Sequence, residues 1–279
     1  MLVEILSEDD RALNMCFETD FANTAIINAM LKSGCSQEEI MSIVWANGSW
    51  PFYTKEFLGL VTYFNNCQKS GHIFGFHKSK NTSIERLKNY VEKKSPWCGS
   101  STPKEEVLQE AIQWTEVEEE NNDFHKWEKE KANLIHDHLK PGERLLINAH
   151  NAHLSKYGIS FGHRLYLIEP DQYYNIAYSF RKGSFWAKST YQMNIEQISA
   201  QTQFSAEYIS NTTNAFVFDI RAFRNSPKFT KWKDHLVSMI DVGAVLRTPA
   251  GEYNNLKLLQ NYDLLICANE ESPSTKYKD

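Results

Sequence analysis

Two histidines three residues apart follow a short apolar run near the middle of the chain. The segment INAHNAHLSKYG, residues 147–158, carries His150 and His153 with Asn151 between them. An imidazole titrates close to neutral pH, so either ring can take a proton from water or give one to a leaving group. The pair therefore indicates acid and base catalysis.

The same spacing allows two other interpretations. A His-x-x-His pair can hold zinc, but a catalytic zinc site takes three protein ligands and the spacing supplies no evident third ligand. We therefore assign no metal and expect no cofactor. In the other interpretation, one histidine caps backbone carbonyl groups at a strand end and the other is exposed.

A carboxylate ends another apolar run near the N-terminus. Glu18 follows residues 15–17, Met-Cys-Phe, and a carboxylate in apolar surroundings is poorly solvated unless a histidine, an arginine or a metal pairs with it. The alternative role is to cap the following helix, but Asp20 is better placed for that. We therefore include Glu18 in the candidate site.

A basic and aromatic segment, residues 178–187, forms a further candidate. It carries Arg181, Lys182, Gly183 and Trp186 directly after an expected strand. As a loop it could hold an oxyanion or a substrate carbonyl group, whereas an ordinary basic surface turn would hold neither.

Strand-like and helix-like patterns alternate along the chain. Apolar runs typical of strands lie at residues 13–18, 72–77, 143–150, 173–180, 215–220 and 263–270. Helical patterns lie at residues 21–34, 36–44 and 54–67, and a longer helical segment covers about residues 103–139. This alternation predicts an α/β fold, with a mixed, largely parallel β-sheet flanked by helices. We expect one domain over residues 1–279, with the long helical segment as an insertion.

In sheets of this class, ligands gather beyond the carboxyl ends of the strands. Glu18, His77, His150 and either Asn269 or Glu270 stand at such ends. We therefore expect these polar side chains to converge on one site, although they are far apart in sequence.

The composition narrows the class of protein. A hydrophobic content of 42% in 279 residues can fill a core, and a net charge of -5 without a dense basic block disfavours nucleic acid as a partner. The five cysteines lack CxxC spacing, so we expect neither a zinc ribbon nor a disulfide framework, and a reducing, cytoplasmic setting. No signal peptide or long apolar run occurs, so we expect no membrane contact. The expected partner is a small molecule, and the oligomeric state stays open.

The histidine segment resembles a known family. LINAHNAHLSKYGISFGHRL is similar to the AHNxH segment of the erythromycin esterase family. CFETDFANTAIINAML resembles that family's second motif, a strand ending in an active-site glutamate, and WPFYTKEFLGLVTYFNN its helix bearing tryptophan and glutamate. Three more segments resemble later strands of the family, namely IFGFHKSK, YYNIAYSFRKGSFWA and YDLLICANEESPS.

The resemblance implies a helix-flanked α/β sheet with a cleft at the strand ends. The implied activity is hydrolysis of a cyclic carboxylic ester such as a macrolide lactone, with antibiotic resistance as the associated role. The implied catalytic residues are Glu18, His150 and His153. The residues expected to contact the substrate are Glu56, His77, Asn151, Arg181 and Trp186.

Two departures from the family pattern change these expectations. The family's first motif, Gly-Glu-x-x-His-Gly, carries a histidine proposed as general base and has no counterpart here, so we expect a truncated domain with weak or lost activity. His77 stands where family members commonly have aspartate. The alternative to a hydrolase is a non-catalytic binding or interaction protein that keeps the cleft. A third possibility is a metal-dependent hydrolase that uses Glu18, His150 and His153.

Overall fold

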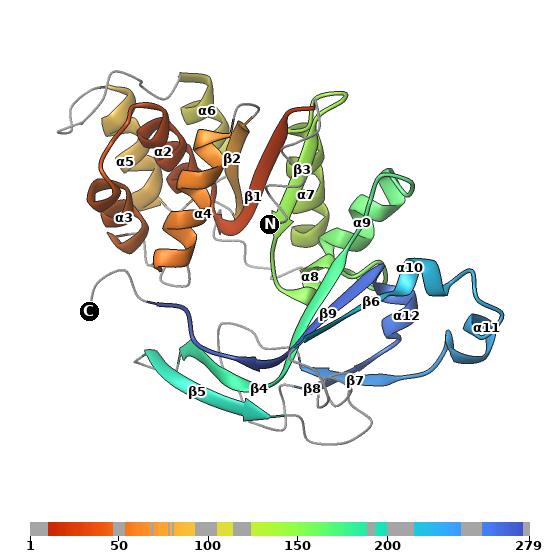
Figure 1. The fold of residues 1–279 in the computed structure, drawn as a ribbon. Coiled ribbons are helices and arrows are strands. Elements are labelled where there is room, and N and C mark those ends of the chain that lie inside the picture. The colour runs from red at the N-terminus through yellow and green to blue at the C-terminus, as the bar shows by residue number, and fades with distance from the viewer. Residues whose placement is uncertain are drawn as a thin grey trace. The chain divides into compact units, whose positions relative to one another are not determined.

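The computed structural model describes most of the chain as two compact units (Figure 1). The described residues are 11–46, 54–67, 70–77, 79, 81–92, 105–113, 124–188, 193–199, 215–240 and 253–275. Only the backbone is described at residues 43–46, 70, 124, 185–188, 193–199, 253 and 254. The first unit comprises residues 1–123, 133–148 and 275–279, and the second comprises residues 124–132 and 149–274.

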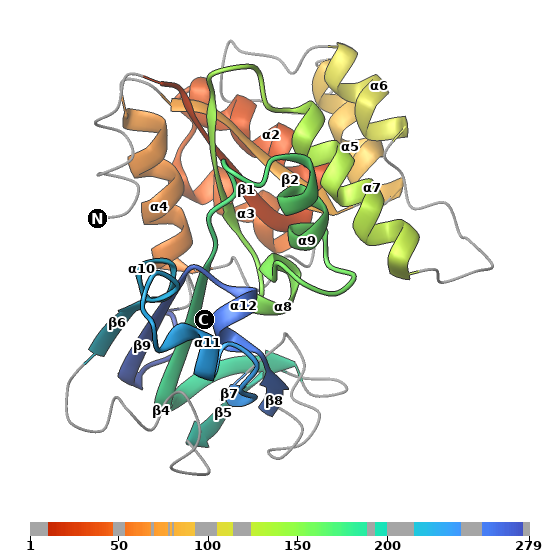
Figure 2. The ribbon, with the colours of Figure 1, turned by 90° about the vertical axis from the view of Figure 1, so that its right-hand side faces the viewer.

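The first unit contains a parallel sheet in the order β2-β1-β3. Its strands are β1 (Leu13–Asp20), β2 (Ser70–His77) and β3 (Arg144–Asn148). Its helices are α2 (Phe21–Lys32), α3 (Gln37–Ala46), α4 (Lys55–Asn66), α5 (Asn81–Val91) and α6 (Glu105–Gln113). Figures 1 and 2 show α2, α5 and α6 side by side, with α2 against β2. The predicted α/β class, with a parallel sheet flanked by helices, is confirmed.

Local sequence explains why the first strand and helix form where they do. Seven of the eight residues of β1 are buried, as expected of a central strand covered on both faces. The Asp20 side chain then accepts a hydrogen bond from the Asn23 backbone N–H at 3.1 Å and caps α2. Gly34, at a φ of 70°, follows the end of α2. This part of the sequence prediction is confirmed.

The long helical segment predicted over residues 103–139 contains two described helices. These are α6 and α7 (Phe124–Asp137), and residues 114–123 between them lie outside the described part. The proposal of one domain over residues 1–279 stays a prediction.

The second unit contains a mixed four-stranded sheet in the order β5-β4-β9-β6. Its strands are β4 (Ile176–Lys188), β5 (Met193–Ser199), β6 (Ala215–Asp219) and β9 (Leu264–Glu271). The strands β7 (Val237–Ile240) and β8 (Tyr253–Leu256) form an antiparallel pair, which Figure 2 shows beside β4. The short helices are α8 (Asn151–Leu154), α9 (Phe161–Ile168), α10 (Ile220–Phe223), α11 (Phe229–Trp232) and α12 (Leu258–Asn261). The buried residues Ala177, Tyr262 and Leu265 belong to its core.

The loop expected after residue 180 is a continuation of strand β4. Residues 182–188 pair with β5, and Lys182 and Gly183 also pair with Glu270 and Glu271 of β9. A Cβ atom at Gly183 would lie 2.5 Å from the Glu271 carbonyl oxygen, so glycine here permits close approach of β9 rather than flexibility. The interpretation of this segment as a loop was wrong.

The cysteines differ from the sequence expectation at one position. Cys35 is disulfide-bonded, whereas Cys16, Cys67 and Cys267 are free thiols. The expectation that the cysteines do not pair was therefore wrong for Cys35. In the described part of the chain, no helix has the length and apolar character that crossing a membrane requires.

A histidine in the first unit is held between two hydrogen-bond acceptors. Nδ1 of His138 lies 2.7 Å from the Leu134 carbonyl oxygen, and Nε2 lies 2.9 Å from Oε1 of Glu110. The ring also stacks on Phe74, with centroids 4.9 Å apart. Only the doubly protonated imidazolium can donate to both oxygens. Although burial alone lowers the pKa of His138, the hydrogen bonds to Glu110 and Leu134 raise it above the ordinary value.

We expect this histidine to make the stability of the chain depend on pH. Because the pKa is raised on folding, the stabilising contribution is fully present below the unfolded-state value of about 6.5 and is lost as the pH rises through the folded-state value. Glu110→Gln should therefore lower the urea unfolding midpoint more at pH 6 than at pH 9. An equal loss at both pH values would contradict an imidazolium at His138.

Candidate active site

The carboxyl ends of β1 and β2 bring two predicted site residues together within the first unit. Oε1 of Glu18 lies 3.6 Å from Nε2 of His77, where Asp20 and His77 are register partners. The side chain of Glu18 is 15% exposed and that of His77 is 42% exposed. The carboxylate of Glu18 was expected to need a partner, and His77 lies within ion-pair distance of it.

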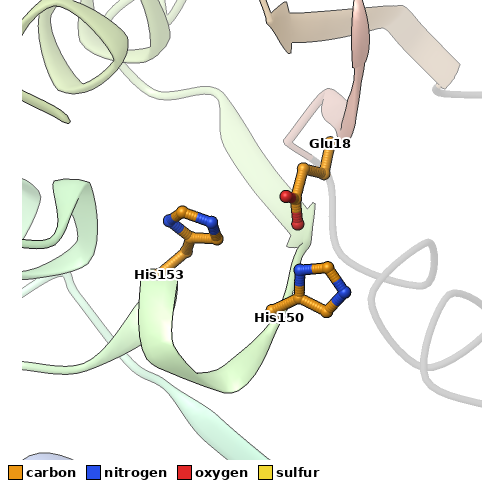
Figure 3. A group of neighbouring side chains, drawn as sticks. All are labelled: Glu18, His150 and His153. Atoms are coloured by element: carbon orange, nitrogen blue, oxygen red, sulfur yellow. The ribbon is translucent and has the colours of Figure 1, made fainter. Parts of the chain in front are cut away.

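The two histidines of the AHNAH segment both belong to the turn that forms α8. His150 is the residue that precedes the helix, with extended backbone dihedrals, and its side chain makes no capping hydrogen bond to α8. His153 lies within α8, and the centroids of the two rings are 6.2 Å apart (Figure 3). Both imidazoles therefore project from one short piece of backbone, which a three-residue spacing on a helical turn explains.

A buried carboxylate orients His153. Nδ1 of His153 lies 3.1 Å from Oε2 of Glu128, and the imidazole stacks on the ring of Phe161 at a centroid distance of 5.6 Å. Glu128 has no exposed side-chain surface. Although burial raises its pKa, hydrogen bonds from His153 and Lys131 lower it below the ordinary value, so Glu128 is ionised at neutral pH.

Glu128 was missed in the sequence analysis, although the sequence contains a signal for it. The buried residues of α7 include Glu128, Lys131, Ala132 and Ile135, at the spacing of one helical face. Two ionisable residues, Glu128 and Lys131, share this stripe with apolar residues, and a buried charged group needs a partner inside the protein. The pattern could have indicated a buried polar contact, but not which residue supplies it.

Asn151 has both side-chain polar atoms engaged by the backbone of one residue. Its Nδ2 donates to the Tyr178 carbonyl oxygen at 2.7 Å, and its Oδ1 accepts from the Tyr178 N–H at 3.1 Å. The hydroxyl of Tyr262 donates to the Asn151 carbonyl oxygen at 2.9 Å. The carboxamide thus pairs with β4 as a neighbouring strand would, and it attaches α8 to the sheet. Its contact with substrate stays a prediction.

The remaining predicted substrate contacts belong to two elements, β4 and α4. Nε of Arg181 donates to Oδ1 of Asn269 at 2.8 Å, across the pair β4-β9. Both carboxylate oxygens of Glu56, in the first turn of α4, lie 3.0 Å from the Thr275 N–H. Despite desolvation, which raises it, the hydrogen bond from Thr275 holds the pKa of Glu56 below the ordinary value. Trp186 lies in β4, and its side chain is outside the described part.

The sequence of the chain was compared with protein family models and with curated protein sequences. A model of the erythromycin esterase family matches residues 129–270, just over half of the chain. No curated protein sequence matches the chain.

Several solved structures have a similar fold at low sequence identity. A succinoglycan biosynthesis protein is 17% identical, with a TM-score of 0.69 over 98% of this chain and 83% of that one. A protein from Bacillus cereus is 15% identical, with a TM-score of 0.71 over 99% of this chain and 85% of that one. A histidine mutant of erythromycin esterase EreC in its open conformation is 11% identical, with a TM-score of 0.61 over 99% of this chain and 86% of that one.

Proposed function

The chain belongs to the erythromycin esterase family, and from this membership we propose that it is a hydrolase that cleaves a carboxylic ester by attack of water. The observation that carries the proposal is the pair His150 and His153 on one turn, with His153 held by the buried carboxylate of Glu128. An imidazole whose ring is held in one orientation by a carboxylate is suited to general base catalysis.

We propose that Glu18 belongs to the same site. The support is strand register within the first unit. Phe17 of β1 pairs with Asn148 of β3, so Glu18 follows one partner and His150 comes two residues after the other. Consecutive Cα atoms are 3.8 Å apart, so the Cα atom of His150 lies within about 7.6 Å of that of Asn148.

In the proposed mechanism, Nε2 of His153 takes a proton from water as the water oxygen attacks the ester carbonyl carbon. Protonated His150 donates a hydrogen bond to the oxyanion that forms, and Glu18 stabilises the positive charge on the imidazoles. The tetrahedral intermediate then collapses, the bond to the alkoxy oxygen breaks, and the alkoxide takes the proton from His153. A cyclic ester gives a single hydroxy acid as the product.

The proposed substrate class is a cyclic ester such as a macrolide lactone. This choice of substrate is based on membership of the erythromycin esterase family. The region that matches the family model includes His150 and His153 but not Glu18. The test is to incubate the purified chain with erythromycin and, separately, with 4-nitrophenyl acetate. The double variant His150→Ala/His153→Ala supplies the blank. We expect hydrolysis above this blank with at least one ester. Saturable binding of the macrolide without hydrolysis would instead support a binding protein.

A metal-dependent version of the same reaction is the second candidate, and it is suggested by the kinds of metal-binding group at the proposed site. Glu18, His150 and His153 supply one carboxylate and two imidazoles, a ligand set found in zinc hydrolases. A bound metal would polarise the carbonyl group and lower the pKa of water. Metal analysis of the purified chain, together with the rate after treatment with EDTA, separates the two versions. Full activity without stoichiometric metal would exclude the metal-dependent version and support the mechanism with His153 as general base.

A further inference from the structure

Glu128 has more partners than an ordinary buried ion pair. Its Oε1 lies 2.8 Å from Nζ of Lys131, one turn further along α7. Its Oε2 accepts from the backbone N–H of Phe161 at 2.8 Å and contacts Nδ1 of His153 at 3.1 Å. All four residues belong to the second unit. The carboxylate is thus held by two donors besides the imidazole, so its position does not depend on His153.

Two helices restrain the imidazole of His153, α7 in the plane of the ring and α9 on its face. Glu128 contacts Nδ1 in the ring plane, and the ring of Phe161 stacks on the face with an interplanar angle of 15°. Phe161 begins α9, whose cap Ser160 accepts from the His163 N–H at 3.2 Å. Rotation of the imidazole would break the contact with Glu128 and the stacking on Phe161 together.

An ionised carboxylate has no proton to donate, so Nδ1 of His153 must carry the hydrogen in this contact. In the neutral ring, the lone pair then lies on Nε2. A histidine in water favours the opposite tautomer, with the proton on Nε2, so the protein has to supply an acceptor to reverse this preference.

We propose that Glu128 is a positioning residue that holds His153 in the tautomer protonated at Nδ1 and thereby makes Nε2 its proton-accepting nitrogen. This role rests on the proposed hydrolase function for its effect on rate, but not for its effect on the tautomer. The carboxylate itself is not required to touch the substrate, because it acts through the imidazole.

The experiment compares two variants that differ only at residue 128. Removing Glu128 alone would leave the buried ammonium group of Lys131 without its carboxylate, which endangers folding. Both variants therefore carry Lys131→Met, and one of them also carries Glu128→Leu. Long-range ¹H–¹⁵N NMR spectra of protein labelled at histidine report the tautomer, and His153→Gln identifies the signal of His153.

We expect His153 to be protonated at Nδ1 in the wild type and in Lys131→Met, and mainly at Nε2 in the double variant. For ester hydrolysis, the double variant should lose about 10- to 100-fold in kcat with little change in KM relative to Lys131→Met. A wild-type His153 protonated at Nε2, or a double variant that keeps the proton on Nδ1, would overturn the proposal. A chain that hydrolyses no ester but shows the expected tautomers would overturn the proposed function and leave this role in place.

Discussion

Replacing either His150 or His153 by alanine is expected to lower kcat for ester hydrolysis by about 10²- to 10⁴-fold, the usual effect of removing a positioned acid or base. The reason is that methyl side chains neither accept the proton of the attacking water nor donate to the oxyanion. The measurement is steady-state hydrolysis of whichever ester the wild-type chain cleaves. Because both imidazoles are proposed to act in one step, the double variant should lose far less than the product of the two single effects.

The matched control is His136→Ala, which removes an exposed imidazole from α7. It should hydrolyse the ester at the wild-type rate. A variant at residue 150 or 153 that keeps the wild-type rate would remove that histidine from the mechanism. A rise in KM with unchanged kcat would assign that histidine to substrate binding.

The largest expected effect on stability lies at Asp263, directly before β9. Its fully buried carboxylate lies 2.6 Å from Nζ of Lys156 and 2.7 Å from Nη1 of Arg224, and it accepts from the Asn175 N–H at 3.1 Å. Asp263→Ala should lower the free energy of unfolding by about 3 to 5 kcal/mol, because it leaves the buried ammonium group of Lys156 without a counter-charge. Urea denaturation followed by circular dichroism measures the loss.

Asp234→Ala is the control for this prediction. Asp234 also pairs with a lysine, since Oδ1 lies 2.9 Å from Nζ of Lys257, but both side chains are largely exposed. Solvent screens such a pair, so its removal should leave the urea midpoint unchanged. Equal midpoints for the two variants would show that the ion cluster at Asp263 does not stabilise the chain.

Elements with strong local signals could be predicted from the sequence. The apolar run of β1 and the cap at Asp20 lie within ten residues of each other, and both formed as expected. The continuation of β4 through residues 181–188 could not be predicted in this way. Residues 182–188 pair with β5, and Lys182 and Gly183 also pair with β9, more than 80 residues away. A segment containing Arg181 and Gly183 carries no local strand signal that would indicate this pairing.

In the candidate site too, local features could be predicted from the sequence and long-range contacts could not. The sequence by itself determined that His150 and His153 share one turn after β3, because three-residue spacing and a preceding apolar run are local properties. Only the tertiary structure decided that Asn151 pairs with Tyr178 and that Glu128 contacts Nδ1 of His153. These contacts join residues 27 and 25 positions apart in the sequence, so they depend on how helices and strands pack and not on any pattern within one element.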